Sequence, residues 1–171
     1  DYKVTGVQTC ALPISAIGWY GHDKGKVFTE EMPAHHDFLG STCAAWEASL
    51  YPAKTMGIRL VTLRIGIVLS NEGGVLTEFK KPIHFGIAPI LGNGKQMISW
   101  IHIDDLCRLM EFSVNHQEVS GVYNATAPYP VTNKEMMLSL AQKIRKGFIP
   151  IHVPALLLKL VLGEMSIEVL K

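Results

Sequence analysis

The stretch GNGKQMISWIHIDD, residues 92–105, decides the fold class. It reads as a glycine-lined turn, an apolar strand and two aspartates. The apolar residues after it recur at three- and four-residue steps, as in a helix: Leu106, Leu109, Met110 and Val114. We therefore expect a turn, a buried strand at 97–103, and a helix with Asp104 as its N-cap. Polar groups where a strand meets a helix lie at the ligand-binding edge of an α/β sheet.

The turn itself resembles a phosphate-binding loop only at first sight. A P-loop has four residues between its glycines and a serine or threonine after the lysine. Here a single residue separates Gly92 from Gly94, and Gln96 follows Lys95. The sequence therefore predicts a tight hairpin-like turn without phosphate chemistry.

Strand and helix patterns alternate through the rest of the chain. The run IRLVTLRIGIVL, residues 58–69, is β-branched and apolar, which predicts a strand buried on both faces of a parallel sheet. Asp37 is expected to cap a helix over 38–56 that Gly57 ends. The remaining expected elements are a weak helix from 75 to about 81 followed by breakers at Pro82, Gly86 and Pro89, a strand within 121–127, a helix from Thr132 or Asn133 to about 146, a strand at 148–153, and an apolar helix from Pro154.

Composition excludes several classes of protein. The chain has 171 residues, 48% hydrophobic and 18% charged, with a net charge of +1, which indicates a folded domain without a nucleic-acid footprint. The longest apolar run, residues 153–163, is about 11 residues long, short of the roughly 20 that span a membrane. The cysteines make neither a disulfide framework nor a metal spacing, and the pair His35-His36 reads as solvated loop, so we expect a cytoplasmic protein without a metal.

The first residues do not fit the rest. VTGVQTCALPIS, ending at Ser15, resembles the conceptual translation of a sequencing-library adapter. We therefore expect residues 1–14 to be non-native and the natural sequence to begin further upstream. Ser15 lies at the junction, and two origins are open for it: the natural sequence or the adapter. The blander alternative is an ordinary N-terminal strand and loop.

Several motifs together carry a family resemblance. SAIGWYG, LRIGIVLS, ISWIHIDDL and GVYNATAP follow one another in this order. They resemble the extended and atypical short-chain dehydrogenase/reductases, and most of all the NAD(P)-dependent epimerase family that ends in a DUF1731-type domain. DFLGSTCAAWEAS and VPALLLKLVLGEM resemble that subgroup specifically. The resemblance covers residues 15–171.

The resemblance implies an α/β fold: the C-terminal half of a Rossmann-type, NAD(P)-binding parallel sheet at 15–127, then the truncated start of a DUF1731-like C-terminal region at 128–171. The family's cofactor is NADP or NAD. Its pyrophosphate is held by a glycine-rich turn, and no GxGxxG occurs in this chain. The resemblance thus implies a fragment that binds cofactor poorly as it stands and is itself inactive.

The usual catalytic pair of such enzymes is a tyrosine and a lysine four residues later, on one face of a helix. Matching Gly40 and Glu47 to the family pattern places Leu39 and Cys43 at these two positions, so both functional groups are absent. The candidates left for catalysis are Tyr20 and Cys43. Core packing is the alternative for Tyr20, and a small buried hydrophobe is the alternative for Cys43.

The resemblance also assigns residues to the two sides of the site. The expected cofactor-side residues are Ser15, Ala16, Ile65, Gly66, Ile67 and Val68. The expected substrate-side residues are Lys95, Gln96, Trp100 and His102, the last with a hydrogen-bonded core histidine as its alternative.

Two functions follow from these observations. The first is a fragment of an NAD(P)-dependent epimerase or oxidoreductase acting on a small molecule such as a nucleotide sugar. The alternative is a non-catalytic NAD(P)-binding regulatory or interaction protein, motivated by the replacement of the tyrosine and lysine by Leu39 and Cys43. An incomplete sheet leaves an unpaired edge, so the isolated chain is expected to aggregate.

Overall fold

The computed structural model describes residues 10–22, 25–154 and 156–157. These fall into two compact units, each of which is described by itself. Of the described residues, unit 1 comprises 10–21, 26–66 and 103–126, and unit 2 comprises 22, 25, 67–102, 127–154 and 156–157. The α/β architecture with parallel strand pairs confirms the predicted fold class.

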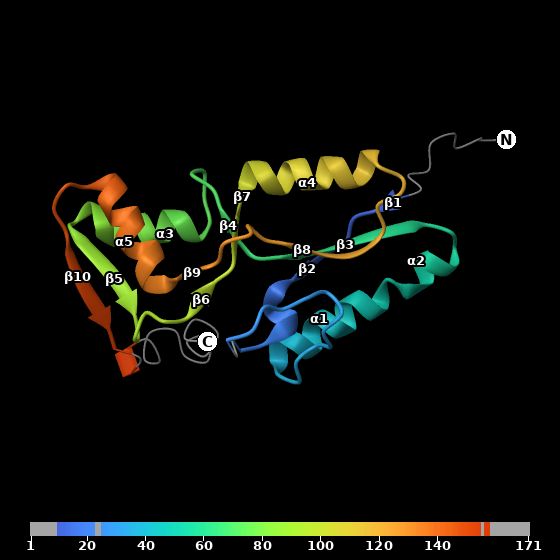
Figure 1. Cartoon of the computed structure of the whole chain (residues 1–171), viewed down its shortest axis with the longest axis horizontal. Coiled ribbons are helices and arrows are strands. Elements are labelled where there is room, and N and C mark those ends of the chain that lie inside the picture. The colour runs from blue at the N-terminus through green and yellow to red at the C-terminus, as the bar shows by residue number, and fades with distance from the viewer. Residues whose placement is uncertain (1–9, 23–24, 155, 158–171) are drawn as a thin grey trace. The chain divides into compact units, whose positions relative to one another are not determined.

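Unit 1 is built around one central parallel strand. Its elements are β1 (Cys10–Ala11), β2 (Ile14–Ala16), the 3-10 turn η1 (Ile17–Tyr20), α1 (Phe38–Ser49), α2 (Tyr51–Thr55), β3 (Arg59–Ile65), α4 (Ile103–Asn115) and β8 (Gly121–Ala125). Strand β3 pairs in parallel with β1, β2 and β8. Helix α4 covers one face of these strands, and α1 with α2 covers the other (Figure 1).

Strand β3 is buried on both faces, as predicted. Val61 and Leu63 are 0% and 1% exposed, and Thr62 and Arg64 are 7% and 3% exposed. Successive side chains of a strand point to opposite faces. The guanidinium of Arg59 bonds carbonyls at the end of α4, so the odd-numbered residues face α4 and the even-numbered ones face α1. The face toward α1 therefore carries the buried polar side chains of Thr62 and Arg64. The sequence pattern had predicted a strand that is apolar on both faces.

The single strand predicted at 58–69 was wrong, because the chain changes partners at Gly66. The amide of Gly66 donates to Ala125 at the end of β8, whereas the next amide, of Ile67, donates to Ser99. Strand β4 (Ile67–Leu69) therefore belongs to a different sheet. Apolar composition marks a buried strand, but it does not encode which strand pairs with it.

The helix predicted at 38–56 forms as two helices. Asp37 caps the first as expected, since its Oδ1 accepts from the amide of Gly40 at 2.8 Å. The break falls at Leu50, just before Pro52, which lacks an amide proton and sits in the first turn of α2. Gly57 follows α2 at φ +78°, a conformation that favours glycine, so this end was predicted correctly.

Among its described residues, unit 2 has three two-stranded sheets and two main helices. Its elements are β4, α3 (Val75–His84), β5 (Ile87–Leu91), β6 (Met97–Ile98), β7 (Trp100–His102), β9 (Val131–Thr132), α5 (Asn133–Ile144) and β10 (Ile149–Val153). Strands β5 and β10 are parallel, β4 and β7 are parallel, and β6 and β9 are antiparallel. Helices α3 and α5 pack beside β5 (Figure 1), around a core of Ile83, Ala88, Met137 and Ala141.

Two predictions between residues 75 and 91 were wrong. Helix α3 does not end near residue 81, because Pro82 is accommodated inside it and the helix runs to His84. Pro89, expected to break structure, lies in the unpredicted strand β5. Among the described residues β5 pairs with β10 alone, and proline is tolerated in such an edge strand because it lacks only a donor.

The opening stretch also differs from its prediction. The turn at 92–95 is confirmed, with Gly94 donating to Leu91 at 2.8 Å. The single buried strand at 97–103 is wrong: it is split at Ser99 into β6 and β7, and Met97 is 40% exposed. Helix α4 begins at Ile103, so Asp104 lies in its first turn and is not its N-cap. A carboxylate there still favours the helix through the dipole.

The later elements follow the prediction. Thr132 caps α5 in a capping box with Glu135, and the strands predicted at 121–127 and 148–153 are β8 and β10. The helix predicted from Pro154 lies almost wholly outside the described residues. Cys10 and Ala11 pair with β3, and the non-native origin of residues 1–14 stays a prediction, as do the boundaries at 127 and 128.

Candidate functional site

The carboxyl ends of β2, β3 and β8 meet at one edge of unit 1. In the strand register Ala16 lies beside Ile65, and Ile65 lies beside Ala125. Ligands of parallel α/β sheets bind at this edge. Four predicted cofactor-side residues lie there together: Ser15, Ala16, Ile65 and Gly66.

Ser15 has an unusual environment within this edge. Its side chain is 9% exposed, and its Oγ is a buried atom without a hydrogen-bond partner among the described residues. An unsatisfied buried hydroxyl costs about 1–3 kcal/mol, so it calls for a partner from outside these residues. The cofactor-side role of Ser15 stays a prediction.

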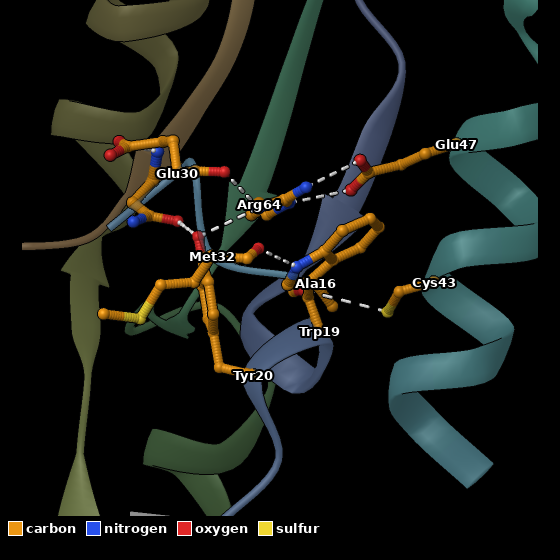
Figure 2. Close-up of polar contacts among 9 residues, drawn as sticks. Ala16, Trp19, Tyr20, Glu30, Met32, Cys43, Glu47 and Arg64 are labelled. Atoms are coloured by element: carbon orange, nitrogen blue, oxygen red, sulfur yellow. Dashed lines mark hydrogen bonds and ion pairs between the residues drawn. The ribbon is translucent and has the colours of Figure 1, made fainter. Parts of the chain in front are cut away.

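The two residues at the predicted catalytic positions face the same strand end. A methyl group built on Gly18 would come within 3.2 Å of Leu39 Cβ, so α1 packs closely on η1 here. The thiol of Cys43 is half-buried and donates to the carbonyl of Ala16 at 3.7 Å (Figure 2). Helix α1 therefore presents the expected face, with an isobutyl group and a thiol in place of phenol and ammonium.

A buried arginine, which the sequence reasoning missed, connects helix α1 to this edge. Arg64 donates through Nε and Nη2 to the two carboxylate oxygens of Glu47, at 2.9 Å each (Figure 2). The side chains are 3% and 13% exposed. Such bidentate, charge-assisted pairs fix both distance and orientation.

The same guanidinium also contacts η1 and the loop that follows it. Its Nη1 donates to the hydroxyl of Tyr20 at 3.0 Å and to the carbonyl of Glu30 at 3.2 Å. The guanidinium lies 3.6 Å from the ring centroid of Trp19, within cation–π range. One side chain thus contacts three segments of unit 1, as Figure 2 shows.

Tyr20 and the loop complete the network. The Tyr20 hydroxyl donates to Asn124 Oδ1 at 2.7 Å, and its ring stacks on Phe28 with centroids 5.1 Å apart. The carboxylate of Glu30 accepts a hydrogen bond from the backbone amide of Asn124 at 2.8 Å. The Trp19 indole donates to the carbonyl of Met32 at 2.8 Å. The loop is therefore held to the ends of the strands at several points.

Electrostatics keep Arg64 charged. Burial acts to lower the pKa of its guanidinium, but hydrogen bonds to Glu47 and Tyr20 and the charge of Glu47 together raise the pKa above its ordinary value. The guanidinium is thus a permanent buried cation whose charge is balanced by one carboxylate. It is suited to holding groups in place and not to exchanging protons.

Tyr20, the first predicted catalytic residue, is 6% exposed and its hydroxyl both donates and accepts within this network. Its catalytic role stays a prediction, as does that of Cys43. The signal that could have revealed the network is Arg64 itself, because a charge inside an apolar strand needs a buried partner.

Unit 1 contains a cavity of about 550 Å³. It is bordered by Ile58, Leu60 and Thr62 on the sheet side and by residues of α1 and α2 that include Ala44 and Ala48. Leu60 and Thr62 lie in the amino-terminal half of β3, and Ile58 just precedes the strand. Trp19 and Glu47, which both contact Arg64, also line the cavity, so it adjoins the Arg64 network.

The remaining predicted residues all lie in unit 2. Ile67 pairs with Trp100 and Val68 with Ile101 in the β4–β7 sheet. Gln96 Nε2 donates to the carbonyl of Leu91 at 3.1 Å, and the Trp100 indole donates to the carbonyl of Tyr129 at 3.2 Å. The other two residues of the substrate-side group, Lys95 and His102, are exposed. Their roles toward a ligand stay predictions.

The described part of the chain shows neither a metal-binding cluster nor a membrane-spanning helix. No group of three or more His, Cys, Asp or Glu side chains there could hold a metal ion. Within the same residues, no helix is both long enough and apolar enough to cross a membrane.

The chain is similar to proteins of known families. No protein-family model matches it. It is 36% identical to an epimerase family protein of Mycobacterium leprae, over 95% of this chain and 52% of that protein. It is 39% identical to an epimerase family protein of Staphylococcus aureus, over 91% and 52%. The chain thus spans about half the length of these relatives.

Solved structures give the same result. The nucleoside-diphosphate sugar epimerase of Corynebacterium glutamicum superposes with a TM-score of 0.71 at 35% identity, covering 90% of this chain and 34% of that one. A human epimerase family protein crystallised with NADPH superposes with a TM-score of 0.79 at 26% identity, covering 95% and 56%. The UDP-glucose 4-epimerase of Thermus thermophilus in complex with NAD, at 19% identity and a TM-score of 0.69, shares the fold.

Proposed function

We propose that this chain, which is related to the epimerase family of the short-chain dehydrogenase/reductases, forms the nicotinamide and substrate side of an NAD(P)-dependent epimerase or oxidoreductase. The observation that carries the proposal is the buried Ser15 hydroxyl, which has no partner among the described residues and lies at the carboxyl edge of the parallel strands. Relatives crystallised with NADPH and NAD support the cofactor class.

When bound, NAD(P) would supply a hydride acceptor or donor. Ser15 would then hydrogen-bond the reacting group, and Ala16, Ile65 and Gly66 would border the nicotinamide. Glu47 and Arg64 would hold α1 against this edge. The proposed substrate is a small molecule such as a nucleotide sugar, which the name of the Corynebacterium relative supports. We further propose that residues 128–171 begin a DUF1731-type substrate region and that the protein is cytoplasmic.

A second function has one observation in its favour. Leu39 and Cys43 occupy the face of α1 that lies against β2 and η1, where they offer neither a phenol nor an ammonium group. A protein built this way could bind NAD(P) without transferring hydride. It would then act as a regulatory or interaction protein whose binding of cofactor is the signal.

The experiment is a chimera, because the glycine-rich turn is absent from this sequence. The N-terminal half of the Mycobacterium leprae relative is joined to residues 15–171, and NADPH and NADH are titrated by calorimetry. Cofactor binding supports the proposal, and its absence from a folded chimera overturns it. Turnover of nucleotide sugars by the chimera would favour the enzyme, whereas binding without turnover of any substrate tested would favour the regulatory protein.

A further inference from the structure

The buried charge of Arg64 has no role in the function proposed above beyond holding α1. Arg64 uses all three nitrogens and one flat face of its guanidinium: two nitrogens bond Glu47 on α1, the third bonds Tyr20 and Glu30, and the flat face lies over Trp19. A lone tether to α1 would need only the bond to Glu47. The additional contacts point to a positional task.

We propose that Arg64 is a positioning residue, which sets where η1 and the loop after it, which carries Glu30, lie relative to helix α1. Strand β2 leads directly into η1, so fixing Trp19 and Tyr20 fixes the exit of Ser15 and Ala16. The contact between the Cys43 thiol and the Ala16 carbonyl depends on the same relative position of α1 and β2. The importance of this alignment for cofactor rests on the proposed function, whereas the alignment itself does not.

The geometry explains why this residue is an arginine. A lysine could keep one charged contact with Glu47, but its ammonium is a single point and cannot lie flat on an indole. It could not also reach Tyr20 and Glu30, which a forked guanidinium contacts through Nη1. Arg64→Lys therefore separates charge neutralisation from positioning.

The position of η1 relative to α1 can be measured in the 171-residue chain itself. The chain is labelled with 5-fluorotryptophan, and the Trp19 resonance is assigned through Trp46→Phe and Trp100→Phe. In a Cys10→Ser background, alkylation of Cys43 is measured against Cys107, an exposed thiol on α4 that serves as internal control. Arg64→Lys is expected to move the Trp19 resonance and to raise the Cys43-to-Cys107 rate ratio by about threefold or more, since local opening exposes the thiol.

A Trp19 resonance and a rate ratio unchanged in Arg64→Lys would overturn the proposal, because packing alone would then hold η1. If Arg64→Lys does not fold, the test uses Tyr20→Phe, which removes one of the guanidinium's acceptors and is expected to shift the Trp19 resonance. An unshifted resonance in Tyr20→Phe would then overturn the proposal.

The chimera adds a functional readout. Arg64→Lys is expected to weaken NADPH binding on the order of tenfold without a matching change in the unfolding midpoint, because small misplacements of site groups are costly. Equal affinity despite a displaced η1 would overturn the positional role toward cofactor. A chimera that binds no NADPH contradicts the proposed function, while the fluorine and alkylation results still decide the alignment.

Discussion

Arg64 and Glu47 form a bidentate ion pair, with both N–O distances at 2.9 Å, between a central strand and the helix that covers it. Because Arg64 is buried and the Glu47 side chain is only 13% exposed, loss of the carboxylate leaves a buried guanidinium without a counter-charge. Glu47→Gln is expected to lower the free energy of unfolding by about 3 kcal/mol. Urea titration followed by circular dichroism measures this change.

The matched control is Glu78→Gln on α3. Glu78 pairs with Lys81 at 2.7 Å, but both side chains are more than 60% exposed, at 64% and 62%. Its loss is expected to cost less than about 1 kcal/mol. Similar losses in the two variants would mean that the buried pair contributes no more than an exposed one.

Gly40 is expected to resist substitution although it lies in a helix. Alanine in a helix interior is more stable than glycine by about 1 kcal/mol. At Gly40, however, an added Cβ would overlap the carbonyl oxygen of His35. Gly40→Ala should therefore lower the midpoint of thermal unfolding, by a net destabilisation of about 1–3 kcal/mol.

The neighbouring Ser41 is exposed in the same helix turn and provides the comparison. Ser41→Ala gains helix propensity without a clash, so its midpoint should stay or rise slightly. A stabilised Gly40→Ala variant would show that the close approach of α1 to His35 does not constrain the helix start.

The capping box of α5 predicts a pH dependence of unit 2. Hydrogen bonds from the backbone and side chain of Thr132 lower the pKa of Glu135 below its ordinary value of 4.5. The stability from this interaction is therefore fully present above pH 4.5 and is lost as the pH falls through the lowered pKa. In Glu135→Gln, this part of the acid-induced loss should disappear from urea titrations repeated between neutral and acidic pH.

Thr132→Ala tests the other half of the same box. It removes the acceptor for the amide of Glu135, at 3.2 Å, and is expected to cost about 1 kcal/mol at neutral pH. An acid profile of the unmodified chain that matches Glu135→Gln at every pH would contradict the assignment.

Much of the fold could be predicted because its signals are local. The caps at Asp37 and Thr132 and the glycine at 57 depend on a few adjacent residues, and all three are confirmed. The errors are non-local. Whether Gly66 and Ser99 interrupt a strand depends on which partner bonds the next amide, and no single segment carries that information.

The candidate site divides in the same way. Its edge could be predicted, because strand ends are visible in the sequence and the family resemblance ordered them. The Arg64 network could not, since its members lie up to about a hundred residues apart, as with Asn124 and Glu30. The sequence shows a buried charge, but its partners emerge only when β3, α1 and β8 are placed together.

Ser15 gives the sharpest prediction about the site. Its hydroxyl has no hydrogen bond among the described residues, so Ser15→Ala should leave the unfolding free energy of the chain unchanged or slightly higher. In the chimera, the same change should slow turnover or weaken substrate binding. A destabilised chain would instead show that the hydroxyl has a structural partner.

The proposed cofactor binding is tested most directly by calorimetric titration of NADPH into the chimera of residues 15–171 with the N-terminal half of the Mycobacterium leprae relative. The account predicts saturable, one-to-one binding in the chimera and none in the 171-residue chain at the same concentrations. A folded chimera that releases no heat of binding at millimolar NADPH and NADH would contradict it.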